Sequence, residues 1–456
     1  MRATTGSFDA QRHGPALSCA NVIPASHPLR FELHDEVHAR PPMPLRAPAR
    51  VSMLALLSPA SERDRERDAL RALAARFDVE LVADDSTGHI AFDCGTFRVK
   101  WERHTEFSRY VFLVEGPGEP FAKAALNAVP DEWVAQLPGM VLHAAHAEVL
   151  PAAPGQTPLV DAVSSAYFGG RALVGSVIAG GAAVALTDFR IDAAGFSRVL
   201  LLDRAMTPPQ TGRAVQALFE VDTYRLLALL AFPVARELSP RLARDERELS
   251  EIASVLVNVA EVDEPVLLDR LTSLQAKIER QEADNHYRFG AADAYYELVR
   301  RRIAQLREER LGSLQTLEEF MERRLAPAMN TCAAVAARLE SLSQRVSRAT
   351  QLLSTRIEMT RERQNQRLLE SMDQRAAAQL RLQGTVEGLS VAAVTYYVIG
   401  IVGYLAKGLE ARGLPLDPAV ITALSIPPVA YFVWRGARRA RKVVKRQLGG
   451  EGSPLE

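Results

Sequence analysis

The sequence has few cysteines, no N-terminal apolar segment and little overall hydrophobicity, and each shortage excludes a class of protein. Its three cysteines, Cys19, Cys94 and Cys332, form no CxxC pair, so no disulfide framework is expected and a reducing cytoplasm is the expected compartment. The first twenty-five residues lack the apolar core of a secretory signal peptide. A mean hydropathy of −0.05 excludes a transporter with many spans. Most of the 456 residues must therefore form soluble domains.

The chain also lacks net charge, because 55 Lys and Arg balance 55 Asp and Glu. This balance hides an asymmetry between two parts of the chain. Residues 330–450 carry 18 basic against 8 acidic side chains, and the rest carries 37 against 47. A basic C-terminal part attracts anionic lipid headgroups, and an acidic remainder attracts cations.

Charge is absent altogether from two stretches near the C-terminus. Residues 388–406 are nineteen uncharged residues and residues 418–434 are seventeen more, joined by a short connection at 407–417. At 1.5 Å per residue, nineteen helical residues extend roughly 28 Å, close to the roughly 30 Å hydrocarbon core of a bilayer. The pattern predicts a helical hairpin that crosses the membrane twice. The alternative is a helical hairpin buried in a soluble core.

Basic residues flank both stretches on the side away from the connection. Five arginines lie between residues 361 and 381, whereas the only basic residues of the connection are Lys407 and Arg412. The second stretch is followed at once by a basic cluster: Arg435, Arg438, Arg439, Arg441 and Lys442. Because loops rich in Lys and Arg stay inside, both termini are predicted to be cytoplasmic, at a bacterial inner membrane. The basic cluster is a topology signal and a site for anionic lipid rather than nucleic acid, or it forms a ring at the cytoplasmic end of an oligomeric pore.

The N-terminal half predicts a mixed sheet with a few helices. Ala49–Leu57 is typical of a buried strand, and Pro59–Phe77 is typical of a charged amphipathic helix. Val99, Trp101 and Arg103 alternate with Lys100 and Glu102, as in a strand buried on one face only. A short helix is expected at 130–137, and further strands are expected at 79–82, 89–94, 96–103, 108–115, 140–150, 172–178, 182–191 and 198–203.

The C-terminal half is predicted to be helical. Pro208 is expected to start a helix whose residues 210–231 are amphipathic, and further helices are expected at 238–260, 264–282 and 291–325. From Val335 to Ile357, apolar or small residues recur at steps of three and four, and no strong breaker separates this seam from residue 388, so one long helix is predicted to enter the bilayer. The fold class is therefore α+β. The predicted parts are a disordered tail (1–26), a cytoplasmic α/β domain (27–205), a helical domain (206–329), a stalk helix (330–387), a two-span hairpin (388–434) and a basic tail (435–456).

Four phrases of the sequence resemble a known family. They are HDEVHARP at 34–41, KWERHTEF at 100–107, VDTYRLLALLAFPVA at 221–235 and QLRLQGTVEGLSVAAVTYYVIGIVGYLAKG at 379–408. Together they resemble an uncharacterised bacterial family, a "domain of unknown function" whose members are described as predicted membrane-anchored proteins. The resemblance implies a membrane anchor and brings no activity with it.

The layout also resembles the CorA-type magnesium transporters. Those proteins have a cytoplasmic α/β domain, a long helix entering the membrane, two C-terminal spans and a basic C-terminal end, and the phrase at 352–372 is similar to their pre-membrane helix. Their first span ends in Gly-Met-Asn at the pore mouth, whereas this chain has Gly403-Tyr404-Leu405-Ala406-Lys407-Gly408. A lysine there repels cations, so the resemblance implies the architecture rather than magnesium transport.

Two polar clusters are candidate sites in the N-terminal half. His34 and His38 would bind zinc if they shared a helix face. The following prolines favour a structural turn instead, with a structural cluster of Glu36, His38 and Arg40. A second cluster offers either acid–base catalysis or an ion-pair network between a sheet and a helix: Trp101, Glu102, Arg103, His104 and Glu106. The structural interpretation is favoured for both; no cofactor is evident, and a divalent cation is the one ligand left open.

The two uncharged stretches contain no ionisable Asp, Glu, His, Lys or Arg, which argues against a proton relay. The residues left for a pore are hydroxyls, aromatic residues, glycines and a lysine at the mouth: Thr395, Tyr396, Gly400, Gly403, Tyr404 and Lys407. Small residues of this kind equally allow helices to pack closely. Both interpretations stay open.

One architecture and two functions follow. The leading hypothesis is a CorA-like homo-oligomeric cation channel, or a derivative without the selectivity motif, because two spans from one chain cannot enclose a conduit. The alternative is a membrane-anchored sensing or scaffolding protein without transport activity. Enzymatic activity is not expected.

Overall fold

The structure is a computed structural model that describes residues 26–31, 33–34, 42–81, 88–256, 263–411 and 417–448, and excludes the side chains of 387 and 440–448. The tail predicted to be disordered lies outside these ranges up to residue 25. Glu36, His38 and Arg40 also lie outside them, so the predictions on that cluster stay predictions.

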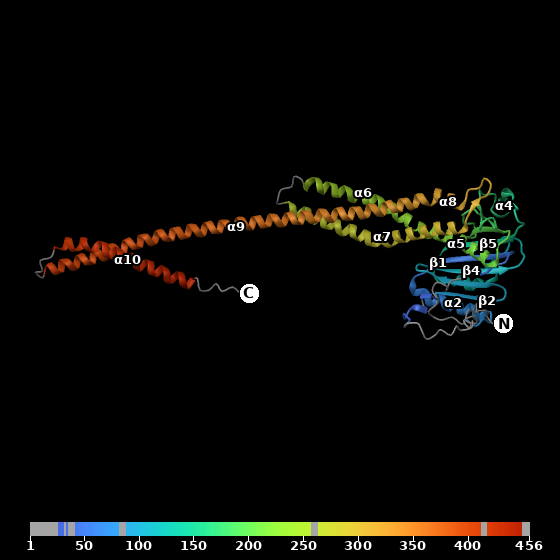
Figure 1. The fold of residues 1–456 in the computed structure, drawn as a ribbon, viewed down its shortest axis with the longest axis horizontal. Coiled ribbons are helices and arrows are strands. Elements are labelled where there is room, and N and C mark those ends of the chain that lie inside the picture. The colour runs from blue at the N-terminus through green and yellow to red at the C-terminus, as the bar shows by residue number, and fades with distance from the viewer. Residues whose placement is uncertain are drawn as a thin grey trace. The chain divides into compact units, whose positions relative to one another are not determined.

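The described chain contains a mixed sheet of nine strands (Figure 1), eight from residues 49–203 and the ninth, an edge strand, from residues 309–310. The order is β2-β3-β4-β1-β5-β8-β7-β6-β9. Neighbours run antiparallel except β5 and β8, which are parallel. This confirms the predicted fold class. The strands are β1 (Ala49–Leu57), β2 (His89–Asp93), β3 (Arg98–Arg103), β4 (Phe107–Glu115), β5 (Met140–Pro151), β6 (Val174–Ile178), β7 (Ala183–Thr187), β8 (Ser197–Asp203) and β9 (Glu309–Arg310).

Helices cover both faces of the central strands. The short helix η2 (Ala60–Glu62) leads into α2 (Arg63–Arg76), which packs with α3 (Asp131–Ala135) and the short helix η3 (Ala125–Ala128) on one face. Helix α5 (Pro208–Leu229) packs against the other face, beside β5 and β8. Every residue from Val99 to Arg103 is consequently buried. The prediction that β3 is buried on one face only was therefore wrong, because a helix about 100 residues further along the chain covers the second face.

One predicted strand is not formed. Residues 79–81 have no regular structure, and residue 82 lies outside the described ranges. The chain leaves α2 through Asp78, which has a φ of +53°, and the amide of Val79 donates to the carbonyl of Ala74 at 2.9 Å. Val79 and Leu81 still pack against the core, so their apolar character reflects burial in a loop rather than pairing in a sheet.

Helices predominate in the described chain after Pro208. The helix predicted at 264–282 is present and begins at Glu264, but the predicted break before residue 291 and the helical continuation to 325 were wrong. One helix runs from Glu264 through Gly290 to Leu306 and is followed by Arg307 at a φ of +49°. Burial of Leu271, Ile278 and Val299 outweighs the roughly 1 kcal/mol that a helical glycine costs. The remaining helices are α4 (Val160–Tyr167), α6 (Ala231–Leu256), α7 (Glu264–Leu306), α8 (Leu317–Arg324), α9 (Ala326–Glu410) and α10 (Pro418–Leu448).

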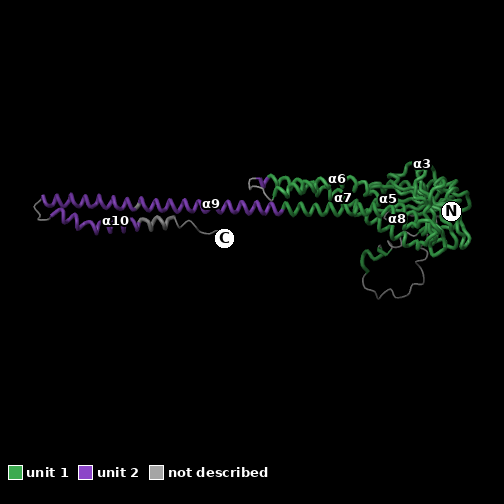
Figure 2. The backbone as a smooth tube through the Cα atoms, turned by 90° about the horizontal axis from the view of Figure 1, so that it is seen from above, with its two compact units in different colours: residues 1–259, 266–350 green, residues 260–265, 351–456 purple. Residues whose placement is uncertain are grey.

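The long predicted helix is present as α9, which is continuous from the seam into the first uncharged stretch. Seam residues Val335, Leu342, Val346 and Leu353 are buried. The chain divides into two compact units, residues 1–259 with 266–350 and residues 260–265 with 351–456 (Figure 2). The first unit contains the sheet and most of the helices that pack on it, and the second contains the C-terminal part of α9 and all of α10. The finer domain boundaries stay predictions.

Candidate functional site

The KWERHTEF segment forms β3 and the turn into β4, and its side chains point alternately to the two faces of the sheet. Trp101 belongs to an apolar core with Leu70 and Phe112. Tyr110 and Phe112 each meet the ring of Trp133 edge-on, at centroid distances of 6.2 and 6.1 Å. The aromatic member of the predicted site is thus a core residue.

A charged network lies on the opposite face, between the sheet and α5. Lys100 Nζ is 2.8 Å from Glu102 Oε1. The Arg109 guanidinium donates from Nε to Glu102 Oε2 at 2.8 Å and from Nη1 to Glu220 Oε1 at 2.9 Å. Arg302 of α7 pairs with the same Glu220 carboxylate. The network therefore joins β3 and β4 to α5 and α7.

Burial and charge act in opposite directions on Glu102. Desolvation alone would raise the pKa of its carboxyl, but Arg109 and Lys100 together outweigh burial and lower the pKa to about 2. The pKa of Lys100 is lowered, mainly because burial disfavours its charged form. A general base needs a pKa near the working pH. Glu102 is therefore a poor proton acceptor at neutral pH and serves to neutralise its cationic neighbours.

A small cavity borders this network. It measures about 30 Å³ and is lined by Lys100, Glu102, Arg109 and Gln216 on one side and by apolar side chains such as Val51 and Phe219 on the other. One water occupies roughly 10–15 Å³ when the volume is that open to the centre of a water-sized sphere, so the cavity holds about two waters. It is too small for a substrate and can hydrate the buried charges.

Arg103 belongs to a second, separate network on the Trp101 side of the sheet. Its Nη1 lies 2.8 Å from Glu66 Oε1 of α2 and 2.9 Å from Ser108 Oγ, and its Nη2 donates to the carbonyl of Ser58 at 2.9 Å. Ser108 Oγ also donates to Glu66 Oε2 at 2.6 Å. Glu66 and Arg103 are both buried, so this network ties α2 to the sheet.

The remaining members of the predicted cluster lie in the turn between β3 and β4. The His104 ring stacks on Phe107 at a centroid distance of 4.3 Å. Glu106 pairs with Arg288 of α7 at 2.6 Å. The structure therefore divides Trp101, Glu102, Arg103 and Glu106 among a core, two ion networks and a contact with α7 rather than bringing them to one site.

Residues 43–45, which follow the HDEVHARP phrase, pack against the N-terminal end of α5. The amide of Leu45 donates to the carbonyl of Pro208 at 3.0 Å, and Arg98 Nη2 donates to the carbonyl of Pro44 at 3.0 Å. A Cβ on Gly212 would lie 1.9 Å from the carbonyl oxygen of Met43. Only glycine allows the backbone to approach α5 this closely. Met43 and Leu45, which follow this phrase closely in the sequence, thus form part of the wall of the cavity.

A buried histidine network was missed at the level of sequence. His143 of β5 lies 2.9 Å from Asp222 Oδ2 through Nε2 and 2.9 Å from Thr223 Oγ1 through Nδ1, and Ser197 Oγ is also 2.9 Å from Nε2. The pKa of Asp222 is lowered: burial would raise it, but Arg225 and His143 outweigh burial. All four members of the network around His143 are buried. A histidine within the apolar run of β5 is the one signal in the sequence.

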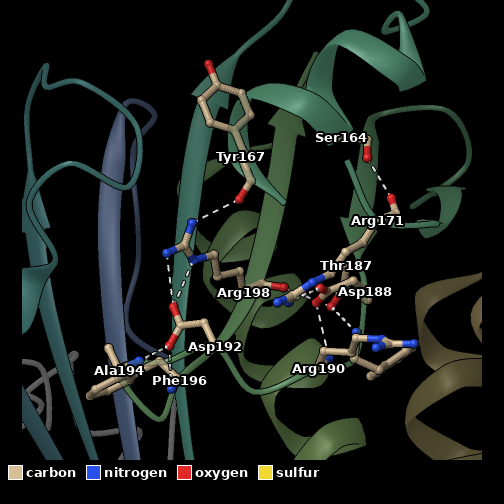
Figure 3. Close-up of polar contacts among 11 residues, drawn as sticks. Ser164, Tyr167, Arg171, Thr187, Asp188, Arg190, Asp192, Ala194, Phe196 and Arg198 are labelled. Carbon is tan, nitrogen blue, oxygen red and sulfur yellow. Dashed lines mark hydrogen bonds and ion pairs between the residues drawn. The ribbon is translucent and has the colours of Figure 1, made fainter. Parts of the chain in front are cut away.

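Acidic residues of the loop between β7 and β8 are bound by arginines and backbone amides (Figure 3). Arg198 donates to Asp192 Oδ2 at 3.0 Å and to the carbonyl of Tyr167 at 2.9 Å. Arg171 donates to Asp188 Oδ2 at 3.1 Å. No group of His, Cys, Asp or Glu among the described residues has the arrangement of a metal site.

Comparison with known families covers nearly the whole chain. A family model described as "Protein of unknown function (DUF3422)" matches residues 25–444. The chain belongs to the DUF3422 family. No curated protein and no solved structure matches it significantly. The resemblance to CorA-type transporters therefore stays a prediction. The matched range includes both ion networks of this DUF3422 chain and the uncharged parts of α9 and α10.

Those uncharged parts of the DUF3422 chain lie side by side in the second unit. A Cβ on Gly403 would lie 3.2 Å from Thr422 Oγ1 of α10, whereas Gly400 has open space. Tyr396 and Tyr404 are exposed. The hydroxyl of Thr395 donates to the carbonyl of Val391 at 2.7 Å. Gly403 thus serves as a packing residue, and the Thr395 hydroxyl is satisfied within its own helix.

Aromatic and basic side chains follow one another at the end of the uncharged part of α10. The Arg438 guanidinium lies 4.0 Å from the centre of the Trp434 ring, and Arg435 Nη1 donates to the Tyr431 hydroxyl at 3.1 Å. Arg439 is exposed. The side chains of Arg441 and Lys442 lie outside the described set, although α10 continues through both positions.

Proposed function

We propose that this DUF3422 protein is an integral membrane protein whose hairpin of α9 and α10 anchors a cytoplasmic α/β and helical body. The observation that carries the proposal is exposure. In the most apolar window of α9, 6% of the residues are buried, and in that of α10 none is. A helical hairpin in a soluble core would be mostly buried, and leaving one Leu or Phe in water costs about 1.5–3 kcal/mol. A lipid bilayer is the partner that removes this cost.

Side chains at the ends of the hairpin agree with this anchor. Tyr431 and Trp434 precede Arg435 and Arg438, and aromatic residues followed by basic ones are typical of a cytoplasmic membrane interface. The basic end then contacts anionic headgroups, each Lys or Arg contributing about 1 kcal/mol. Sensing or scaffolding is the role proposed for the body, since the Gly-Met-Asn motif of CorA-type transporters is absent and Lys407 lies at the expected pore mouth.

Two glycines provide a matched test of topology. Gly408 lies within the connection and Gly384 lies before the first uncharged stretch, and a Cβ at either position meets open space. In intact spheroplasts, a membrane-impermeant maleimide should label Gly408→Cys and should label Gly384→Cys only after the membrane is permeabilised. Wild-type protein corrects for the native cysteines. Equal labelling of both variants in intact cells would contradict the proposed hairpin.

Cation conduction by a homo-oligomer is the second candidate. Tyr396, Gly400 and Lys407 share one face of α9 at 3.6 residues per turn, and such a face can line an axis shared by several copies. Gly403 on the same face packs against α10, which leaves less of it for a conduit. For this reason the anchored body ranks first.

Flux into proteoliposomes separates the two candidates. A conducting assembly should pass cations down a gradient and should pass more when Lys407→Asn removes the charge at the mouth, because a fixed cation opposes cation entry. If oligomeric preparations of both the wild type and Lys407→Asn pass no monovalent or divalent cation, conduction is excluded. The protein then serves as a membrane-anchored body without transport.

A further inference from the structure

The part of α9 between Glu358 and Glu387 is exposed along almost its whole length. These thirty residues extend about 45 Å. Large apolar side chains remain open to solvent there, including Leu368 at 62%, Met372 at 65% and Leu380 at 69%. Helices in proteins gain most of their stability by packing an apolar face against a partner. The apolar side chains of this segment therefore indicate a packing partner outside the chain itself.

The apolar residues of this segment form two separate seams. At 3.6 residues per turn, Leu368, Leu382 and Val386 lie along one line of the helix, here called seam A. Leu369, Ala376 and Leu380 lie along a second line, seam B, roughly 110° around the helix from seam A.

Mostly polar residues separate the two seams. Asn365, Gln379 and Gln383 lie on the line between them, together with Met372, and charged residues occupy the opposite face. A two-stranded coiled coil buries one apolar seam per helix. Two seams so far apart cannot both be buried between two copies, but each can be buried against a different neighbour.

We propose that this segment of α9 packs in parallel against two other copies of the same chain, seam A against seam B, in a ring of at least three copies. The inference rests on the membrane anchor proposed above, because identical hairpins in one bilayer hold the copies parallel and at equal height. At 3.6 residues per turn, the heptad seam from Val335 to Leu353, already buried in the same helix, continues along the side of seam A. The line of Gln379 and Gln383 then faces the axis of the ring.

Charges beside the seams are complementary in this arrangement. Arg375 lies within seam A, and Asp373 borders seam B about 3 Å away along the axis. No ion pair joins either residue to another described residue of its own chain. In a ring, Arg375 of each copy meets Asp373 of its neighbour. Between Glu358 and Glu387 basic and acidic residues are equal in number, five of each, so identical copies do not repel one another through net charge.

Cysteine crosslinking in native membranes tests the ring with the full-length chain. Leu368→Cys/Leu369→Cys places one thiol in each seam at nearly equal height. Oxidation should give a ladder on non-reducing gels that extends beyond the dimer, whereas each single variant should give little product. The matched control is Ala377→Cys/Ala378→Cys, an adjacent pair on the opposite side, which should stay at the wild-type background.

The outcomes distinguish the ring from the anchor. A product that stops at the dimer in single and double variants would overturn the ring in favour of a two-fold contact, and no product above background would overturn self-association through this face. If the same variants leave the membrane on alkaline extraction, the anchor fails rather than the ring. Arg375→Asp should abolish the ladder, and adding Asp373→Arg should restore it; a ladder unaffected by Arg375→Asp would refute the proposed pairing.

Discussion

Replacement of Glu66 by Leu should strongly destabilise the body, because it leaves a charge buried without its counterion. Glu66 is fully buried, and its carboxylate accepts from Arg103 at 2.8 Å and from Ser108 at 2.6 Å. After the change, the Arg103 guanidinium, 4% exposed, retains only the neutral Ser108 hydroxyl and the Ser58 carbonyl. Breaking a buried pair in this way typically costs about 3–5 kcal/mol. Glu66→Leu should lower the free energy of unfolding by that amount.

Urea unfolding of the full chain in detergent measures this loss, and Trp101 and Trp133 in the adjacent core report the transition by fluorescence. The double variant Glu66→Leu/Arg103→Met removes both charges and should recover most of the stability, since apolar replacements of buried pairs are often neutral or stabilising. Asp68→Ala, which breaks an exposed pair on the same helix, should change little. A loss below about 1 kcal/mol for Glu66→Leu, or a double variant as unstable as the sum of its parts, would refute the reasoning.

Three further variants test other parts of the body. Gly212→Ala should destabilise the protein and expose residues 43–46 to limited proteolysis, because its Cβ would clash with Met43. Gly290→Ala, in open space on α7, should instead stabilise the protein by up to about 1 kcal/mol. Equal effects of the two variants in thermal unfolding would contradict the close approach of the Met43 backbone to α5. Burial raises the pKa of Glu148, whose Oε1 accepts from the amide of Phe121, to about 7. Between about pH 4.5 and 7 the native state therefore binds more protons than the unfolded chain. The free energy of unfolding should consequently fall by up to ~3 kcal/mol as the pH rises through this window. Glu148→Gln should flatten this dependence in urea titrations at pH 5 and 8, and an unchanged slope would exclude Glu148 as its source.

Local pattern was sufficient to predict most strands and helices. The apolar run at Ala49–Leu57 corresponds to β1 with the same bounds, and the seam from Val335 to Leu353 is buried as its spacing indicates. Periodicity depends on neighbours only a few residues away. It failed at Gly290, where a residue unfavourable in isolation is carried by the packing of the rest of α7.

Local sequence pattern could not predict which residues pair in the buried networks, because the partners are far apart in the sequence. Arg109 pairs with Glu220 at a separation of 111 residues, and Glu106 pairs with Arg288 at 182. The KWERHTEF phrase was identified as polar and dense, but its division between two faces depends on α5 and α7, whose positions no nearby residue specifies. For the same reason His143 gave no indication of its contact with Asp222.

Membrane residence of the full chain tests the central claim most directly. After expression, membranes are washed at high salt and high pH and floated on a density gradient without detergent. The account predicts that the protein floats with the lipid and enters solution only when detergent is added, since the apolar surfaces of α9 and α10 are covered by lipid rather than by protein. A chain that stays in the aqueous fraction, monodisperse and folded, would contradict it.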